Sequence, residues 1–255
     1  MDNFTDILNI AFLNCCGQTG FDLPKQLQIQ HFIQKYNIDI LNLQETCIDK
    51  DTFHDCPFIS KNFEIIKNNS GNNYGTCSLV RNSLTASNIV KHKSGRLILF
   101  DIGPLTLGNF YLPSGSDGQS RSLRENYCAE VIPNLMINAQ LSGLVGGDWN
   151  NIVAKEDATK NPESKVSSSL KRVIKAFGWK DAYRFLHPTG KHFSRYYSNV
   201  KFQGASRIDR CYFYGDIIPT KSTYESVAFS DHLAHVISVK PPPPIILTLG
   251  PKFRP

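Results

Sequence analysis

The stretch from Leu144 to Asn151 reads Leu-Val-Gly-Gly-Asp-Trp-Asn-Asn. A short apolar run reaches two glycines, where the backbone can turn tightly, and it then presents the Asp148 carboxylate and the Asn150 amide two residues apart. We expect both side chains to leave the same side of the strand end. A carboxylate that takes a proton from water, beside an amide that holds a phosphate oxygen, suits metal-assisted phosphodiester hydrolysis. Because Gly-Gly-Asp is also ordinary turn chemistry, the rest of the chain must decide between the two interpretations.

Length and composition indicate a globular protein. The 255 residues, 41% of them hydrophobic, suffice for a substantial core, and the formal charge of +6 leans modestly toward a polyanionic partner. Seven irregularly spaced cysteines indicate free thiols in a reducing compartment, and Cys15-Cys16 lacks the second pair that a zinc site needs. The sequence shows neither a signal segment nor a membrane-spanning run, so we expect an intracellular protein without a membrane partner.

Apolar runs in the first half predict a strand, a helix and a strand, followed by a series of short strands. The first unit comprises buried strands at Ile7–Leu13 and Ile38–Leu43, joined by a helix from about Pro24 to Asn37. The short strands have hairpin spacing, which predicts an antiparallel meander. They are Phe63–Lys67, Thr76–Val80, Ala86–His92, Leu97–Ile102 and Leu105–Phe110.

The second half repeats this mixture of helices and strands. We expect a helix with Leu123 and Leu135 that Pro133 kinks or splits, and an amphipathic helix that begins near Val166 and stops at Gly178. The strands expected after it are Asp181–Arg184, Phe193–Val200, Arg207–Tyr214, Thr220–Phe229 and Ala234–Val239. Each half supplies about one sheet, which predicts an α/β fold with two sheets packed face to face and helices outside. We assign residues 1–239 to one domain and residues 240–255 to a Pro-rich tail or linker.

Polar residues follow the predicted strands. Glu45 and Asp231 are acids that could satisfy a hard cation such as Mg²⁺, and a buried Asp209 would orient His232 and favour its protonated form. Each residue also has an ordinary structural explanation, as a loop acid, a cap or a turn. Together they are harder to dismiss. The clusters are Asn14, Gln44-Glu45-Thr46, Asp148 with Asn150, Ser206-Arg207-Ile208-Asp209 and Ser230-Asp231-His232.

These clusters resemble, in order, the signature motifs of the endonuclease/exonuclease/phosphatase superfamily. Within it, the stretch Asp181 to Pro188, with Phe193-Ser194 and Ser206 to Arg210, resembles the apurinic-like endonuclease domain of LINE-type non-LTR retrotransposons. The motifs that carry the resemblance are Leu13-Asn14-Cys15-Cys16-Gly17, Leu43-Gln44-Glu45-Thr46, Asn109-Phe110-Tyr111-Leu112-Pro113, Gly147-Asp148-Trp149-Asn150, Ser206-Arg207-Ile208-Asp209 and Ser230-Asp231-His232.

The resemblance implies a four-layered α/β sandwich, like that of deoxyribonuclease I, with two mainly antiparallel sheets. It also implies a nuclear DNA endonuclease that uses Mg²⁺, with Mn²⁺ able to substitute, and that leaves a 3′-hydroxyl to prime a linked downstream reverse transcriptase. Glu45, Asn14 and Asp231 would lie at the metal, and Tyr111 and Asn150 at the phosphate. Asp148 would activate water, while His232, oriented by Asp209, would stabilise the developing charge. The residues that we expect near the DNA are Ser194, Arg195, Tyr196, Lys201, Arg207 and Ser230.

Two departures from the family pattern affect these expectations. Cys15-Cys16 replaces an aliphatic-Asn pair, which we expect to alter packing only. Ser194-Arg195 replaces a Thr before an aromatic residue, and either residue could fill the Thr position.

Residues 195–204 predict a hairpin that carries bases and aromatics, and we expect it to enter a DNA groove. The alternative without a role in DNA binding is an ordinary surface hairpin with its tyrosines on the core face. Two other functions remain open: a phosphoesterase of the same superfamily acting on RNA, lipid or inositol phosphates, and a catalytically inactive DNA-binding module.

Overall fold

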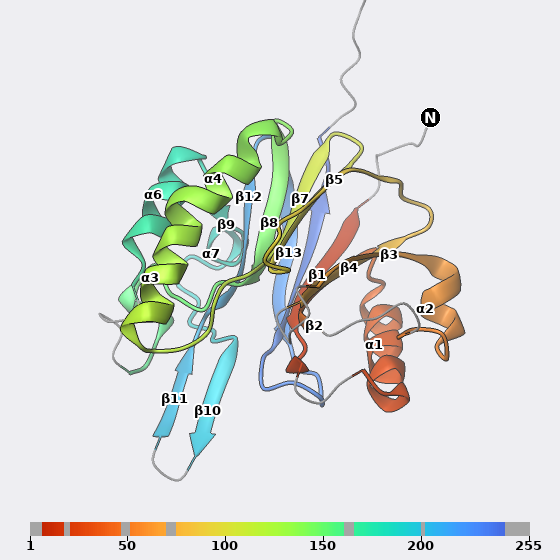
Figure 1. Cartoon of the computed structure of the whole chain (residues 1–255), viewed down its shortest axis with the longest axis horizontal. Helices are drawn as coiled ribbons and strands as arrows, with labels where there is room; N and C mark the ends of the chain where they lie inside the picture. Colours follow the sequence, from red (N-terminus) through yellow and green to blue (C-terminus); the bar gives the residue numbers. More distant parts are fainter. Residues whose placement is uncertain are drawn as a thin grey trace, which may run out of the picture.

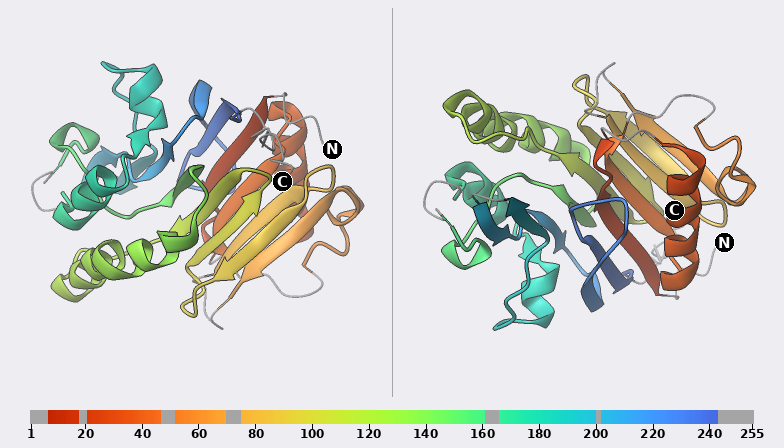
Figure 2. Two further views of the ribbon diagram at one scale, coloured as in Figure 1. Left: turned by 90° about the horizontal axis from the view of Figure 1, so that it is seen from above. Right: turned by 90° about the horizontal axis from the view of Figure 1, so that it is seen from below.

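The computed structural model describes residues 7–17, 21–46, 52–69, 75–160, 166–199 and 202–242. Two six-stranded sheets pack face to face, and helices cover the outer face of each (Figure 1). The end-on views of Figure 2 show the same layers from both ends of the strands. The predicted four-layered α/β sandwich is confirmed.

The first sheet combines both ends of the described chain. Its only parallel pair among the described strands is β1 with β2, which α1 connects by crossing over the sheet. The strand order is β13 (Ile218–Glu225), β14 (Ala234–Lys240), β1 (Leu8–Asn14), β2 (Ile40–Thr46), β4 (Gly75–Arg81) and β3 (Phe63–Asn68).

The second sheet is built from the middle of the chain. Here β7 and β8 are parallel, and the helical segment from α3 to α4 connects them. The order is β5 (Ala86–Lys91), β6 (Leu97–Ile102), β7 (Leu105–Tyr111), β8 (Ser142–Asp148), β12 (Asp209–Tyr214) and β9 (Lys180–Asp181). A separate hairpin of β10 (Arg195–Asn199) and β11 (Phe202–Ser206) projects beyond the sheets in Figure 1.

The predicted helices form with the expected boundaries. α1 (Leu23–Tyr36) starts at the Asp22 cap and ends at Asn37, which adopts the left-handed conformation. The helix expected around Leu123 to Leu135 forms as α3 (Gly118–Asn126), a π-helical turn (Tyr127–Val131) and α4 (Ile132–Leu135), so the regular α-helix is interrupted before Pro133 and not at it. The amphipathic helix is α6 (Ser168–Ala176). Two further helices are α2 (Pro57–Asn62) and α7 (Ala182–Leu186), and 3₁₀ turns form at Met136–Asn138 and Lys155–Asp157.

The assignment of one sheet to each half of the chain is wrong. The expected meander divides, since β3 and β4 stay in the first sheet while β5, β6 and β7 start the second. At the other end, β13 and β14 return to the first sheet, where β14 pairs with β1. Without β14, the strand β1 would be an open edge with unpaired backbone groups, which is costly for a strand this apolar.

The strand predicted at Asp181–Arg184 is also wrong. Only Lys180 and Asp181 pair with β12, and the helix α7 begins at Ala182. The Asp181 side chain accepts a hydrogen bond from the Arg184 backbone N–H, which is the contact of a helix N-cap. A cap contact therefore overrides the local preference for a strand.

Three of the four hydrophobic clusters formed by the described residues match the layers. Phe12, Phe100 and Leu144 lie in the layer between the two sheets, while Ile29 and Phe32 of α1 pack on the outside of the first sheet. Outside the second sheet, the buried Trp149 packs edge-on against Phe110, Trp179 and Tyr212, with ring centroids 5.3 to 6.1 Å apart. The Asp148 motif is therefore anchored on one side by its neighbouring tryptophan.

Gly147 gives a test of this anchoring. Its φ is +133°, and an added Cβ would collide with the Phe110 carbonyl group of the neighbouring strand. We expect Gly147→Ala to lower the free energy of unfolding by about 2 kcal/mol or more, because the conformation is strained for alanine and the backbone cannot give way.

The measurement is urea denaturation followed by tryptophan fluorescence. Gly118→Ala is the matched control, because a Cβ at Gly118 meets nothing within 4 Å and the residue opens α3. The control should be neutral or stabilising by up to about 1 kcal/mol. Equal stability of the Gly147 variant and the wild type would contradict the account.

Candidate active site

The candidate site lies at the edge where strands of both sheets end. Asn14 ends β1, Tyr111 ends β7 and Asp148 ends β8, while Asp209 begins the antiparallel β12. In the strand register, Asp148 pairs with Tyr111 on one side and with Asp209 on the other. The sheet itself therefore sets these three side chains next to each other.

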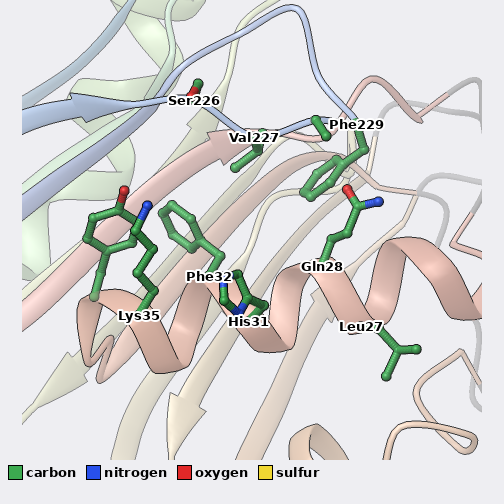
Figure 3. A pocket seen from close by; sticks show the side chains of 10 residues that line it. Leu27, Gln28, His31, Phe32, Lys35, Ser226, Val227 and Phe229 are labelled. Atoms are coloured by element: carbon green, nitrogen blue, oxygen red, sulfur yellow. The ribbon is translucent and has the colours of Figure 1, made fainter.

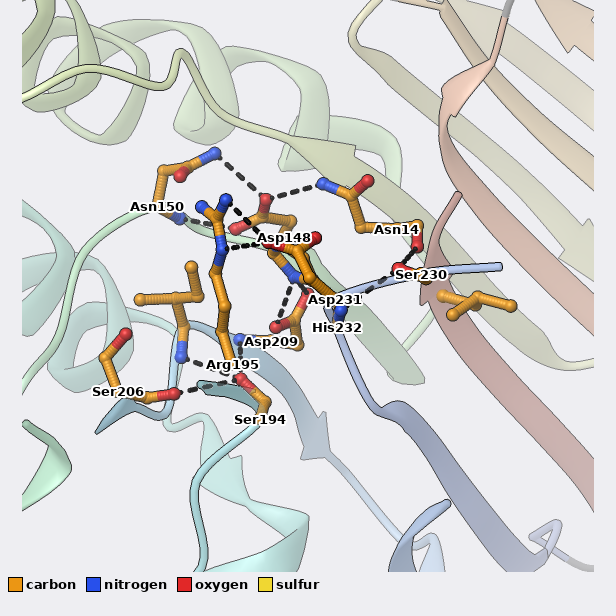
Figure 4. Close-up of polar contacts among 12 residues, drawn as sticks. Asn14, Asp148, Asn150, Ser194, Arg195, Ser206, Asp209, Ser230, Asp231 and His232 are labelled. Atoms are coloured by element: carbon orange, nitrogen blue, oxygen red, sulfur yellow. Dashed lines mark hydrogen bonds and ion pairs between the residues drawn. The ribbon is translucent and has the colours of Figure 1, made fainter. Parts of the chain in front are cut away.

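Asp148 is the centre of the hydrogen-bond network (Figure 4). Its Oδ2 accepts bonds from Asn14 Nδ2 at 2.9 Å and Asn150 Nδ2 at 3.0 Å, and its Oδ1 accepts from the Asn150 backbone N–H at 2.9 Å. As expected, the Asp148 and Asn150 side chains meet. Burial, with 1% of the residue exposed, and then the nearby Asp209 carboxylate raise the pKa of Asp148 to about 7. A carboxylate with a pKa near neutrality can accept a proton from water under physiological conditions.

His232 lies beside Asp148 and forms a buried ion pair with Asp209. Its Nδ1 contacts the two Asp209 oxygens at 2.9 and 3.0 Å. Burial lowers the pKa of His232, but the Asp209 charge and hydrogen bond more than offset this and bring the pKa to about 9. The imidazole is therefore a cation at neutral pH, and its Nε2 can donate a hydrogen bond.

The loop that carries His232 is tied to the first sheet through Ser230. The Ser230 hydroxyl accepts a bond from the His232 backbone N–H at 3.0 Å and donates to the Asn14 carbonyl oxygen at 2.7 Å. Ser230 therefore fixes this loop, and its expected position near the DNA stays a prediction.

Glu45 lies on the other side of Asn14. Its Oε1 accepts bonds from Asn14 Nδ2 and from the Tyr111 hydroxyl, each at 3.0 Å. The φ of Glu45 is +53°, which is unfavourable for a residue with a side chain. The Glu45 carbonyl group lies so close to Gly17 that a Cβ at position 17 would collide with it, so this backbone arrangement requires glycine at position 17. The Arg96 guanidinium lies 4.7 Å from the centre of the Tyr111 ring.

Two groups could hold a divalent cation. Oxygen and nitrogen atoms of Asp148, Asp209 and His232 lie within 4.8 Å of one another. In that group, however, the protonated imidazole is bonded to Asp209 and would repel a cation. Glu45 offers carboxylate oxygens beside the Asn14 amide, which is the chemistry that Mg²⁺ prefers, so the residues at Glu45 fit this ion better.

Asp231, the third expected metal residue, is engaged elsewhere. Its Oδ2 forms an ion pair with Arg195 at 2.9 Å, and its Oδ1 accepts a bond from Cys16 Sγ at 2.8 Å. Tyr196, the next residue of the hairpin, is 53% exposed. Lys201 lies outside the described residues.

Arg207 and Ser194, which were expected near the DNA, contact other parts of the protein in this structure. Arg207 is 1% exposed and pairs with Asp157 at 2.9 Å and Asp181 at 2.7 Å, so it cannot reach a phosphate in this conformation. Ser194 is fully buried, and its hydroxyl accepts bonds from the backbone N–H groups of Ile208 and Asp209, each at 3.0 Å. Ser194 thus supplies the hydroxyl that orients the start of β12, and Arg195 lies beside it.

Three residues of the site were not foreseen. Cys16 bonds to Asp231, Arg96 stacks on Tyr111, and the Tyr224 hydroxyl donates to the Asp209 carbonyl oxygen at 2.8 Å. Only Arg96 carried a usable signal, because the hairpin register that pairs Leu97 with Phe110 places it next to Tyr111.

A pocket of about 330 Å³ lies apart from these residues, between α1 and residues 226–229 (Figure 3). Phe32, Val227 and Phe229 provide apolar walls, with His31 and Lys35 also in the lining. None of the expected site residues lines it.

A helix long and apolar enough to cross a bilayer is not found among the described residues.

The fold and the site define the class, a two-sheet α/β sandwich with a carboxylate and an ion-paired histidine at one end of its strands. Residues 11–232 match the model of the Endonuclease/Exonuclease/phosphatase family. This range covers most of the chain and includes Asn14, Glu45, Asp148 and His232, and the chain belongs to this family.

Solved structures support the fold. The chain is similar to an AP endonuclease from Archaeoglobus fulgidus, with 17% identity, a TM-score of 0.75 and coverage of 90% of this chain and 98% of the other. It is also similar to truncated TDP2 from Caenorhabditis elegans, with 20% identity, a TM-score of 0.66 and coverage of 94% of this chain and 100% of the other. A third similar structure is a variant of the 3′ phosphatase NExo from Neisseria bound to product DNA hairpin, with 17% identity, a TM-score of 0.71 and coverage of 90% of this chain and 98% of the other. A search of curated proteins gave no match.

The His232–Asp209 pair predicts a pH dependence of stability. The pKa of His232 rises from 6.5 to about 9 on folding, so its stabilising contribution is complete below about pH 6.5 and is lost as pH rises through about 9. We expect the difference in unfolding free energy between the wild type and His232→Gln to shrink over this interval, by on the order of 2 kcal/mol. Urea denaturation in EDTA at pH 6, 7.5 and 9 measures it. A difference that stays constant with pH would show that the imidazole is not protonated in the folded protein.

Proposed function

We propose that this protein is a Mg²⁺-dependent DNA endonuclease that nicks double-stranded DNA and leaves a 3′-hydroxyl end. The observation that carries the proposal is the position of Asp148. The Asp148 carboxylate, whose pKa is raised to about 7, accepts hydrogen bonds from Asn14 and Asn150 and lies beside the Asp209–His232 ion pair. Attack of water on a phosphodiester needs a base that takes the proton of the water and a cationic hydrogen-bond donor that stabilises the phosphate, and Asp148 and His232 could supply these two groups.

In the proposed reaction, Asp148 orients a water molecule and accepts its proton as the oxygen attacks phosphorus. His232 donates a hydrogen bond to the phosphate as negative charge develops, and Asp209 keeps its imidazole protonated and correctly oriented. Tyr111 and Asn150 position the phosphate. Glu45, with Asn14 beside it, would hold Mg²⁺, which when bound stabilises charge on the leaving oxygen.

Two features support DNA as the substrate. The hairpin of β10 and β11 leaves the body of the protein at the site, with Arg195 at its base and the exposed Tyr196 next to it. Basic and aromatic side chains in this position can contact phosphates and a groove. The variant of the Neisseria 3′ phosphatase NExo, which has a similar fold, is bound to product DNA hairpin.

The proposal extends to the biological setting. The stretch from Asp181 to Pro188 resembles the endonuclease domain of LINE-type retrotransposons. On this basis the nick would prime reverse transcription in the nucleus, by a reverse transcriptase domain linked downstream of the proline run. Mn²⁺ would substitute for Mg²⁺. The alternative is a phosphoesterase of the same family that acts on other phosphate esters.

Nicking of supercoiled plasmid tests the proposal. We expect the wild type with Mg²⁺ to convert the plasmid to open circles, and Asp148→Asn and His232→Ala each to slow nicking by roughly 10²- to 10⁴-fold, because each removes a proton-transfer or charge-stabilising group. EDTA should abolish the activity.

Two controls sharpen this experiment. Asp39 directly precedes β2, at the opposite end of that strand from Glu45, and the variant Asp39→Asn should nick like the wild type. A chain in which Gly-Ser replaces residues 199–202 should still nick, but at altered positions if the hairpin selects the target. No nicking by the wild type, with release of phosphate from 3′-phosphate ends instead, would favour the phosphatase alternative.

A further inference from the structure

The ion pair between Arg195 and Asp231 departs from the metal-binding role first expected for Asp231. Arg195 contacts one oxygen of the carboxylate, Oδ2, through Nε at 3.0 Å and Nη2 at 2.9 Å. The other oxygen, Oδ1, accepts the bond from Cys16 Sγ. Both carboxylate oxygens therefore already have partners, and a cation would have to displace one of them.

The backbone places Arg195 in the site and not at the tip of the hairpin. Arg195 is the first residue of β10 and forms an isolated β-bridge with His232. Figure 4 shows the Arg195 guanidinium pointing toward Asp231 and Asp148. The side chain is 30% exposed, so that a ligand can reach it.

The guanidinium has donors to spare. It carries five N–H groups, of which the bonds to Asp231 use two. Within the described part of the chain, we find no hydrogen bond from the others. A planar guanidinium held from one side by a carboxylate can present its free edge to a phosphate oxygen, the geometry in which arginine binds phosphate most strongly.

We propose that Arg195 is a catalytic residue that binds a non-bridging oxygen of the scissile phosphate, and that Asp231 is a positioning residue for Arg195 and not a metal ligand. This inference rests on the proposed nuclease function. It accounts for the arginine at the position where the family pattern has an aromatic residue. It also confines the metal-binding group to Glu45 and Asn14.

A double-mutant cycle separates this role from metal binding. We expect Arg195→Met and Asp231→Asn each to lower the single-turnover cleavage rate of a duplex by about tenfold to hundredfold. The double variant should be no slower than Arg195→Met alone, since Asp231 acts through the arginine. Arg195→Lys keeps the charge without the planar fork and should retain part of the rate. Rate losses that multiply in the double variant would overturn the proposal.

Calorimetry with Mn²⁺ tests the metal-binding half without catalysis. Asp231→Asn should bind Mn²⁺ within about twofold of the wild type, whereas Glu45→Gln should bind at least about tenfold more weakly. A tenfold loss in the Asp231 variant would show that Asp231 is a ligand, and would contradict us.

The matched control is the pair of Arg81 and Asp39, whose atoms lie 3.1 Å apart and whose arginine is about as exposed as Arg195. Arg81→Met and Asp39→Asn should change neither cleavage nor Mn²⁺ affinity. If the wild type does not cleave DNA, the proposed function fails, and the inference is then decided by Mn²⁺ affinity and by duplex binding in EDTA. Arg195→Met should weaken that binding at least about threefold, and Arg81→Met should not.

Discussion

The structure depends on a buried arrangement of like charges at the end of two paired strands. Asp148 and Asp209 are partners in the register of β8 and β12, and both are almost fully buried. Two adjacent carboxylates without water would repel each other strongly. The His232 proton offsets this repulsion, while hydrogen bonds from Asn14 and Asn150 hold the Asp148 carboxylate. The same interactions that make the site tolerable for folding give it an acid and a base at neutral pH.

The two-sheet architecture brings these groups together. Asn14 and Glu45 come from the first sheet, and Asp148 and Asp209 from the second, so the site forms only when the sheets pack against each other. The loop that carries His232 precedes β14, which returns from the far end of the chain to pair with β1. Ser230 then fixes this loop to the Asn14 carbonyl. The pairing of β14 with β1 therefore also places His232 at the site.

The sequence predicted more of the site than of the topology. Asp148 with Asn150 follows from residues two apart at a strand end, and the motif resemblance paired Asp209 with His232. The sheet membership of β13 and β14 was missed, because a strand's local pattern does not show which edge it will cover. The burial of Arg207 was not foreseen because its partner Asp157 lies 50 residues away and nothing nearby in the sequence indicates that the arginine is buried. The Arg195–Asp231 contact likewise needed the hairpin base to be placed.

The central claim is that Asp148 activates water for attack on a DNA phosphodiester. Cleavage of a labelled duplex in ¹⁸O-water, with mass spectrometry of the ends, tests it most directly. The account predicts 3′-hydroxyl ends and 5′-phosphate ends that carry one ¹⁸O atom, since the water oxygen bonds to phosphorus as the bond to the 3′ oxygen breaks. Ends with a 3′-phosphate, or the same products at an unchanged rate from Asp148→Asn, would contradict it.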